Sequence, residues 1–356
     1  MNRPDLVDTR IPAEGVYAVE KEPRLIGDST AFGALVAAIR DLRQPKHAEV
    51  SPVPDDVRID GRTCLVTGAN SGLGKAAAVE LARRGGNMIL ACRPGHGEIC
   101  EEVRRRSGSA TVEVMEVDLA DLGSVHRFCD ILDSRRIRID IALMNAGLMA
   151  PRARKSAQGY EMMFAVHFLS SRVMIDRWMR DGVMCPSSRP GETPRIVFVA
   201  SEAHRCSHAV DFDRLGAFTD YRRKESFKYY GISKLLLCMY ATELSRRLNP
   251  GDRVKVAVHA MCPGGVASNI ARDTPALLKP LVNPLLQHFL QPPEEAVGPA
   301  IYLCCAEEAG NTTGMYLHLM QRKSVLPAAS DPGNGAGLWE ASEKLAAASR
   351  EFLQTP

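Results

Sequence analysis

Long apolar runs and a strong net charge are both missing from this 356-residue sequence. A helix that spans a bilayer needs about 20 consecutive apolar residues, and no stretch approaches that length. The formal net charge of +3 is too small to favour a nucleic-acid partner. The first ten residues, MNRPDLVDTR, carry acidic side chains and no apolar segment typical of signal peptides. We therefore expect no nucleic-acid partner, no transmembrane segment and no secretion signal.

The spacing of the cysteines points in the same direction. The ten cysteines are scattered without a CxxC pair, and the chain is far longer than a disulfide-stapled secreted module. We expect reduced thiols and a cytoplasmic location. The sequence also lacks HExxH, and we assign the ligand-type residues from His204 to His208 to a loop rather than to zinc. We expect no metal site.

The composition is that of a globular protein, with a hydrophobic fraction of 45% and a charged fraction of 24%. Prolines punctuate residues 1–58, which we interpret as an N-terminal extension with one helical stretch. Residues 59–325 form a single main domain. Residues 326–356 form a C-terminal tail with a helix over Leu338–Leu353.

Within the main domain, short β-branched or apolar runs alternate with longer helical stretches. Predicted strands lie at Thr63–Thr67, Met88–Cys92, Val112–Val117, Ile139–Met144, Arg195–Val199, Val254–Ala260 and Met315–Leu319. Predicted helices lie at Gly74–Arg84, Glu98–Arg106, Leu122–Asp133, Gly159–Arg180, Tyr229–Leu248 and Glu294–Ala306. This alternation predicts an α/β fold with a doubly wound, Rossmann-type parallel sheet flanked by helices, and ligands at the carboxyl ends of the strands.

The first predicted strand ends in a glycine-rich turn, TGANSGLG from Thr67 to Gly74, and an alanine-rich helix begins at once. Glycines permit positive φ and let the backbone approach a pyrophosphate, while the amino end of the helix offers unpaired N–H groups and a positive dipole. At the first strand-to-helix junction of a βαβ series, this turn predicts a dinucleotide-binding site.

The spacing G-x-x-x-G-x-G resembles the cofactor loop of the short-chain dehydrogenase/reductase family, and further motifs of that family follow in order over roughly residues 60–325. By this resemblance Asp118 contacts the adenine, and the NAG motif after the fourth strand lies beside the cofactor. The PG motif after the sixth strand lies around the nicotinamide amide. The implied cofactor-binding set is Gly68, Asn70, Ser71, Gly72, Leu73, Gly74, Asp118, Leu119, Asn145, Ala146, Gly147, Pro263, Gly264, Val266 and Ser268.

The end of the second strand bears on which dinucleotide is bound. An acidic side chain there would hydrogen-bond a ribose 2′-hydroxyl and repel a 2′-phosphate, but this sequence reads Ala91-Cys92-Arg93. A guanidinium pairs bidentately with phosphate. We therefore expect Arg93 to favour NADP(H) over NAD(H).

A tyrosine and a lysine, Tyr230 and Lys234, are four residues apart and therefore share one face of a helix. A free phenol has a pKa of about 10, and a neighbouring cation favours its ionised form. By resemblance to the family, Tyr230 exchanges a proton with the substrate oxygen, and Lys234 supports it. Both also belong to the implied cofactor-binding set, Lys234 through the ribose. Ser201, at the end of the fifth strand, holds the substrate carbonyl. The predicted function is hydride transfer between a carbonyl and an alcohol.

One departure from the family pattern bears on the chemistry. Relatives carry an asparagine that anchors a water leading to the lysine, whereas this sequence has His167, and Phe168, Ser170 and Ser171 differ as well. An imidazole can hold a water and relay protons. Two interpretations stay open: His167 acts as a catalytic relay residue, or it marks a packing change in an enzyme with a weak relay. Loss of catalysis, leaving an NADP(H)-binding scaffold or sensor, is a third.

The sequence has Ala91-Cys92-Arg93, the segment Gly159–Phe164 and, near the C-terminus, Leu338-Trp339-Glu340. With these features the overall layout resembles the retinol-dehydrogenase-like branch of the family, which implies a lipophilic aldehyde, ketone or alcohol such as a retinoid or steroid. Branches that reduce C=C bonds use the same tyrosine and lysine, so that reaction is an alternative. The segment Ala267–Leu290 is rich in leucine and proline. It fits a flap over an apolar ligand, a dimer contact or a peripheral membrane face. The Tyr229–Leu248 helix would also allow a homodimer.

Overall fold

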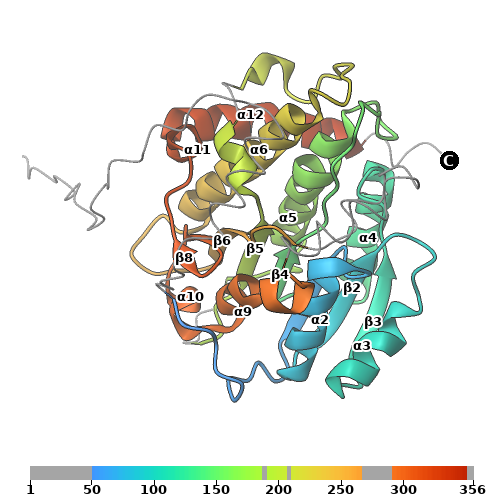
Figure 1. Ribbon diagram of the computed structural model, residues 1–356, viewed down its shortest axis with the longest axis vertical. Coiled ribbons are helices and arrows are strands. Elements are labelled where there is room, and N and C mark those ends of the chain that lie inside the picture. Colours follow the sequence, from blue (N-terminus) through green and yellow to red (C-terminus); the bar gives the residue numbers. More distant parts are fainter. Residues whose placement is uncertain (1–49, 187–190, 207–209, 267–290, 351–356) are drawn as a thin grey trace, which may run out of the picture.

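The computed structural model describes residues 50–186, 191–206, 210–266 and 291–350. It confirms the predicted architecture: an eight-stranded sheet in the order β3-β2-β1-β4-β5-β6-β7-β8 is flanked by helices (Figure 1). All neighbouring strands pair in parallel except β7 and β8. Most of the predicted N-terminal extension and the Ala267–Leu290 segment, including Ser268, lie outside the described residues.

The central strands are short and buried because helices cover both faces of the sheet. β1 and β5 coincide with their predicted ranges. The prediction for β6 was wrong at its start, because the side chain of Asn249 bonds the backbone of Lys255 and Val256 and holds them in a turn. The strands are β1 Thr63–Thr67, β2 Asn87–Cys92, β3 Val112–Glu116, β4 Ile141–Met144, β5 Arg195–Val199, β6 Ala257–Cys262, β7 Tyr316–His318 and the unpredicted β8 Gln321–Arg322.

The helices form two layers. The first layer contains α2 Gly72–Arg83, α3 Ile99–Ser107, α8 Pro293–Ala296, α9 Gly298–Cys305 and α10 Glu307–Asn311. The opposite layer contains α4 Leu122–Ser134, the π-helix η1 Phe164–Leu169, α5 Ser170–Arg180, α6 Ser226–Leu248, α11 Pro327–Ser330 and α12 Pro332–Ala348. Two 3₁₀ turns, η2 Glu202–Cys206 and η3 Phe212–Arg214, connect β5 to α6.

The helix predicted from Tyr229 begins three residues earlier, at Ser226, and two predicted helices differ more at their starts. The stretch from Gly159 is a turn rather than a helix, since Gly159 has a φ of 84° and Glu161 pairs with Lys155 in an isolated bridge. The C-terminal helix begins at Pro332 rather than at Leu338. The carboxylate of Asp331 caps it by accepting the N–H of Asn334 at 2.8 Å, and proline suits the first turn.

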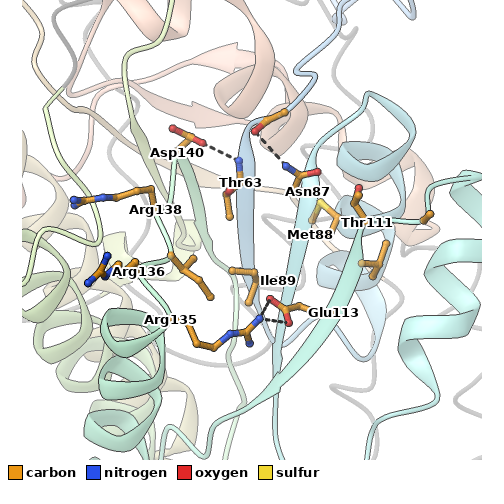
Figure 2. A pocket seen from close by; sticks show the side chains of 14 residues that line it. Thr63, Asn87, Met88, Ile89, Thr111, Glu113, Arg135, Arg136, Arg138 and Asp140 are labelled. Carbon is orange, nitrogen blue, oxygen red and sulfur yellow. Dashed lines mark hydrogen bonds and ion pairs between the residues drawn. The ribbon is translucent and has the colours of Figure 1, made fainter.

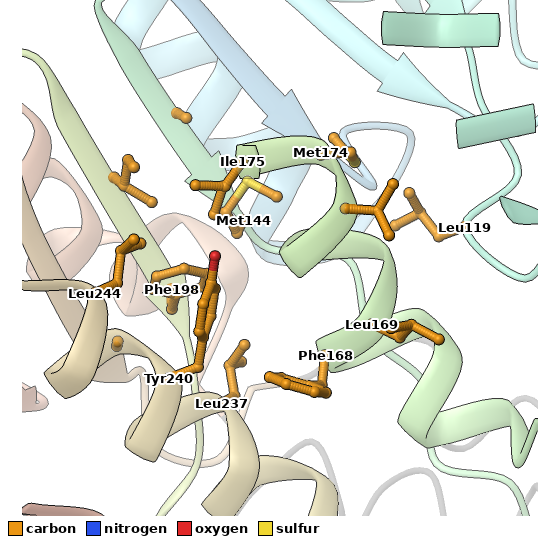
Figure 3. Packing of buried hydrophobic residues seen from close by; sticks show 14 of the residues in the cluster. Leu119, Met144, Phe168, Leu169, Met174, Ile175, Phe198, Leu237, Tyr240 and Leu244 are labelled. Carbon is orange, nitrogen blue, oxygen red and sulfur yellow. The ribbon is translucent and has the colours of Figure 1, made fainter. Parts of the chain in front are cut away.

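Aromatic packing fixes α6 against the elements that carry other candidate site residues (Figure 3). The ring of Tyr240 on α6 packs edge-on against Phe168 of η1 and Phe198 of β5, with centroids 5.6 and 5.8 Å apart. Each such pair contributes about 0.5–1.5 kcal/mol beyond its burial.

On its other side α6 is covered by α12. The indole of Trp339 lies between the guanidinium groups of Arg172 on α5 and Arg247 on α6, whose carbons are 3.9 and 4.3 Å from the ring centre. The C-terminal helix is therefore a layer of the fold and helps to hold α6 in place.

Candidate active site

The predicted motifs meet at the carboxyl edge of the sheet. Gly68 follows β1, Asn145 follows β4, Ser201 lies just past β5 and Pro263 follows β6, and these four strands are neighbours. The strand order runs away from β1 in both directions, through β2 on one side and β4 on the other. This is the switch point at which open α/β sheets bind their ligands.

The glycine turn after β1 has the conformation that a phosphate cradle needs. Gly68 and Gly72 have φ values of 66° and 53°. Gly74 packs against the turn itself: a Cβ there would lie 2.4 Å from Asn145 Nδ2 and 2.5 Å from the Gly68 carbonyl oxygen. The Ser71 side chain, at the N-cap of α2, makes no capping bond. The first N–H groups of α2 therefore remain available to a pyrophosphate, so these residues fit a dinucleotide.

The NAG motif joins this turn to the catalytic candidates. Asn145 Nδ2 donates to the Thr67 carbonyl oxygen at 2.9 Å, and the Thr67 hydroxyl accepts the N–H groups of Asn145 and the following alanine at 2.9 and 3.0 Å. Gly147 lies against two of these candidates: a Cβ there would make a tight contact of 3.2 Å with His167 Nε2 and would lie 3.6 Å from Lys234 Nζ.

The residues predicted at the adenosine end of the cofactor follow β2 and β3. The Gly68 N–H donates to the carbonyl oxygen of the penultimate residue of β2 at 2.8 Å, which ties the end of β2 to the glycine turn. Arg93 comes directly after β2 and is exposed. The carboxylate of Asp118 accepts the N–H of Ala120 at 2.9 Å, whereas the side chain of Leu119 is buried in the core.

The segment after β6 is only partly described. Gly264 has a φ of 78°, and a Cβ there would lie 2.6 Å from the side chain of Leu319. Val266 is buried and pairs with Gln291 in an isolated bridge. The predicted contact Ser268 falls outside the described residues.

Ser201, Tyr230 and Lys234 come together at this edge. The side chain of Ser201 lies close enough to the Tyr230 hydroxyl to lower the pKa of Tyr230. Lys234 Nζ donates to the carbonyl oxygen of Val199, the last residue of β5, at 2.8 Å and lies 5.7 Å from the centre of the Tyr230 ring. The arrangement gathers a phenol, a hydroxyl and a buried ammonium at one edge of the sheet.

Burial shifts the titration of both ionisable groups toward their neutral forms. It raises the pKa of Tyr230 to about 12, although the side chain of Ser201 opposes the rise. It lowers the pKa of Lys234 to about 8. At neutral pH the chain therefore holds a protonated phenol beside an ammonium, an arrangement suited to donating a proton.

His167 is buried between the turn after β4 and helix α6. Its Nε2 accepts the N–H of Leu148 at 2.9 Å, and its Nδ1 lies 2.8 Å from Ser233 Oγ. Its ring stands edge-on to Tyr230, with centroids 5.8 Å apart. Burial, together with the ammonium of Lys234, lowers the pKa of His167 well below its ordinary value.

Sequence reasoning missed two groups beside these residues. Ser233 is the serine of the YGISK segment, but only the fold brings its hydroxyl against His167. Behind Ser201, the ring of His204 bonds to the Ser201 carbonyl oxygen at 2.7 Å and accepts the N–H of Leu326 at 3.1 Å. His204 therefore anchors the loop that carries Ser201, a role that the residue types alone could not reveal.

A hollow with a volume of about 740 Å³ lies at the opposite edge of the sheet. Arg135 pairs there with Glu113 at 3.0 Å, and the Asp140 carboxylate accepts the N–H of Thr63 at 2.8 Å (Figure 2). None of the predicted site residues lines it. Its position at the amino ends of the strands separates it from the candidate site.

Three further observations on the described residues concern metal ions, membrane-spanning helices and cysteines. Across that part of the chain, no three His, Cys, Asp or Glu side chains gather in a group that could hold a metal ion. No helix in it is long and apolar enough to cross a membrane. All ten cysteines are free.

Known proteins resemble the chain in sequence. The family model for short chain dehydrogenases matches residues 62–210. Retinol dehydrogenase 13 of Homo sapiens is 34% identical over 304 residues, which cover 82% of this chain and 86% of that protein. Retinol dehydrogenase 14 of Homo sapiens is 33% identical over 334 residues, covering 88% and 94%. Dehydrogenase/reductase SDR family member 13 of Homo sapiens is 32% identical over 328 residues, covering 91% and 82%.

Solved structures share the fold. An uncharacterized protein from Mycobacterium Paratuberculosis matches with a TM-score of 0.63 and 27% identity, covering 83% of this chain and 98% of its own. A short-chain type dehydrogenase/reductase from Mycobacterium marinum matches with a TM-score of 0.54 and 21% identity, covering 74% and 96%.

The chain belongs to the short-chain dehydrogenase/reductase family, and its curated relatives are consistent with the retinol-dehydrogenase-like branch. It is therefore an oxidoreductase with a fold that binds nicotinamide cofactors, as the sequence motifs predicted.

Proposed function

We propose that the protein is an NADP(H)-dependent enzyme that interconverts a lipophilic carbonyl compound and its alcohol, with Tyr230 as the acid and base. The observation that carries the proposal is the meeting of Ser201, Tyr230 and Lys234 at the sheet edge that also holds the glycine turn. Relatives named retinol dehydrogenase support a lipophilic substrate.

The chain's own residues account for the proton chemistry. A bound nicotinamide ring would supply or accept the hydride. The hydroxyls of Ser201 and Tyr230 lie near each other and would together orient one substrate oxygen. As negative charge develops on that oxygen, Tyr230 donates its proton, and the ammonium of Lys234 stabilises the phenolate that remains. Because burial keeps Tyr230 protonated at neutral pH, the phenol is in the form that carbonyl reduction needs.

A titration and a substrate panel test this function. NADPH and NADH binding is followed by cofactor fluorescence, and NADPH oxidation is then assayed with lipophilic aldehydes, ketones and steroids. We expect tighter binding of NADPH and turnover of at least one carbonyl compound. Turnover restricted to compounds reduced at a C=C bond, or binding without turnover, would contradict the proposed reaction and favour the two alternatives from the sequence.

The cofactor preference is tested at Arg93. Replacing Arg93 with aspartate should weaken NADPH binding by about 10–100-fold, because a charge-assisted bond to the 2′-phosphate becomes a repulsion. NADH binding should change little, since NADH carries no 2′-phosphate. The dissociation constants of both cofactors are measured for this variant and for Arg105→Asp, which makes the same change at an exposed position of α3. Equal losses of NADPH affinity in the two variants would show that the change in net charge, rather than the position of Arg93, causes the effect.

The pKa values set a pH dependence for reduction. Tyr230 stays protonated up to a pKa of about 12, so the proton donor is present throughout the accessible range. Lys234, with a pKa of about 8, is charged below that pH and loses its charge above it. The kcat/KM for carbonyl reduction should therefore be level below about pH 8 and fall by about tenfold per pH unit above it. Initial rates between pH 6 and 10 measure this, and a level profile through pH 9.5 would contradict the role of Lys234.

A further inference from the structure

The hydrogen bonds of His167 form a continuous chain between two parts of the candidate site. On one side Nε2 meets the N–H of Leu148, in the turn that follows the NAG motif. On the other side Nδ1 meets Ser233 Oγ, which donates to the carbonyl oxygen of Tyr230 at 2.7 Å. This series of hydrogen bonds therefore ends on the backbone of Tyr230, the residue that carries the candidate phenol.

The direction of every bond in this chain is fixed. The N–H of Leu148 can only donate, so Nε2 of His167 must be the acceptor and carries no proton. In a neutral ring the proton then lies on Nδ1 and is donated to Ser233 Oγ. The single hydroxyl hydrogen of Ser233 is used on the carbonyl of Tyr230. No ring nitrogen is left to pass a proton onward.

The surroundings also oppose a second proton on the imidazole. The ring is 2% exposed. A Cβ at Gly147 would lie 3.2 Å from His167 Nε2 and 3.6 Å from Lys234 Nζ, so the imidazole and the ammonium both lie close to that glycine. A charged imidazole would lose the bond from Leu148 and face the ammonium of Lys234 inside the protein.

His167 lies in an irregular part of its helix, which serine side chains stabilise. His167 lies within the wide turn of η1, and the hydroxyls of Ser170 and Ser171 donate to the carbonyl oxygens of Val166 and His167 at 2.9 and 3.1 Å. Such bonds satisfy backbone acceptors where a regular helix is interrupted. The serines that depart from the family pattern beside His167 therefore support the same local structure.

We propose that His167 is a positioning residue: a permanently neutral imidazole that ties the cofactor-side turn at Leu148 to α6 at Tyr230 through Ser233. It does not carry protons. The inference rests on the proposed function for its kinetic consequences, but the protonation state and hydrogen-bond direction of His167 can be measured without any turnover.

The first test is nitrogen NMR of the full chain labelled with ¹⁵N-histidine, with the His167 signals assigned from their loss in His167→Asn. We expect a protonated Nδ1 and an unprotonated Nε2 that do not change between pH 5.5 and 9. A ring that titrates in this range, or that carries its proton on Nε2, would overturn the proposal even if the enzyme is active. Failure to find a substrate would defeat the proposed function and leave this result standing.

The second test is kinetic and uses His167→Asn, Ser233→Ala and the double variant. Because the three groups form one linear chain, we expect each single variant to lower kcat by about tenfold and the double variant to lower it no further. The pH at which kcat/KM declines should stay that of the wild type. A shifted pH profile in His167→Asn would identify a proton relay, and independent losses that multiply in the double variant would show that the chain is not a unit.

A matched control separates positioning from general loss of stability. His259 on β6 is also buried and bridges two backbone groups, the carbonyl of Ala309 at 2.8 Å and the N–H of Met315 at 3.2 Å, away from the candidate catalytic residues. We expect His259→Asn to lower the midpoint of denaturant unfolding about as much as His167→Asn while leaving kcat unchanged. Equal losses of kcat in both variants would overturn the proposal.

Discussion

Replacing Tyr230 with phenylalanine is expected to lower kcat for carbonyl reduction by about 10²–10⁴-fold, the contribution of a positioned acid. The change removes one oxygen from a ring that is held by packing, so the ring should stay in place. NADPH affinity should be nearly unchanged, because the proposed phosphate cradle lies between β1 and α2 rather than on α6. Steady-state rates and a fluorescence titration on the same preparation measure both quantities.

Tyr229→Phe is the matched control, since it removes the same atom one residue earlier. Its ring stacks on Tyr221 with centroids 4.3 Å apart, and this stacking does not need the hydroxyl. We expect kcat close to that of the wild type. A Tyr230→Phe enzyme that keeps its turnover would remove the phenol from the mechanism.

Adding one methyl group at Gly74 is expected to weaken NADPH binding by about 10–100-fold, because overpacking of this kind costs about 1–3 kcal/mol. The Cβ of Gly74→Ala would lie 2.4 Å from Asn145 Nδ2 and 2.5 Å from the Gly68 carbonyl oxygen. The turn must then move, and with it the N–H groups that would receive the pyrophosphate. Alanine favours helices over glycine by about 1 kcal/mol, so helix propensity predicts the opposite sign.

Gly97→Ala provides the comparison for this variant. A Cβ at Gly97 meets nothing within 4 Å, and the residue follows β2 near the same edge of the sheet. Its NADPH affinity should match that of the wild type in the same titration. Unaltered binding by Gly74→Ala would place the pyrophosphate away from the glycine turn.

The sequence motifs predicted the parts of the site that depend on local patterns. The glycine turn could be recognised because it follows a strand and opens a helix, and the pair Tyr230 and Lys234 because four residues make about one helical turn. β1 and β5 were located correctly because their apolar runs are bounded by turn residues. In each of these cases the interaction that decides the structure lies within a few residues of chain.

What the sequence could not predict depends on contacts between distant segments. The bond from Leu148 to His167 spans 19 residues, and the bond from His167 to Ser233 spans 66. From the sequence alone, the imidazole of His167 was compatible with a proton relay. Its two hydrogen-bond partners, Leu148 and Ser233, define which ring nitrogen carries the proton. The start of α12 was mispredicted for another reason. The Asp331-Pro332 pair is a local signal for a helix start, but the glycines that follow it disfavour a helix.

A crystal structure of the protein with NADP⁺ and a bound alcohol is the most direct measurement of the central claim. The account predicts the pyrophosphate on the turn from Gly68 to Gly74, and the hydroxyl oxygen of Tyr230 about 3 Å from the alcohol oxygen, within hydrogen-bond reach. It would be contradicted by a pyrophosphate bound elsewhere, or by a Tyr230 side chain that points away from the alcohol while turnover persists.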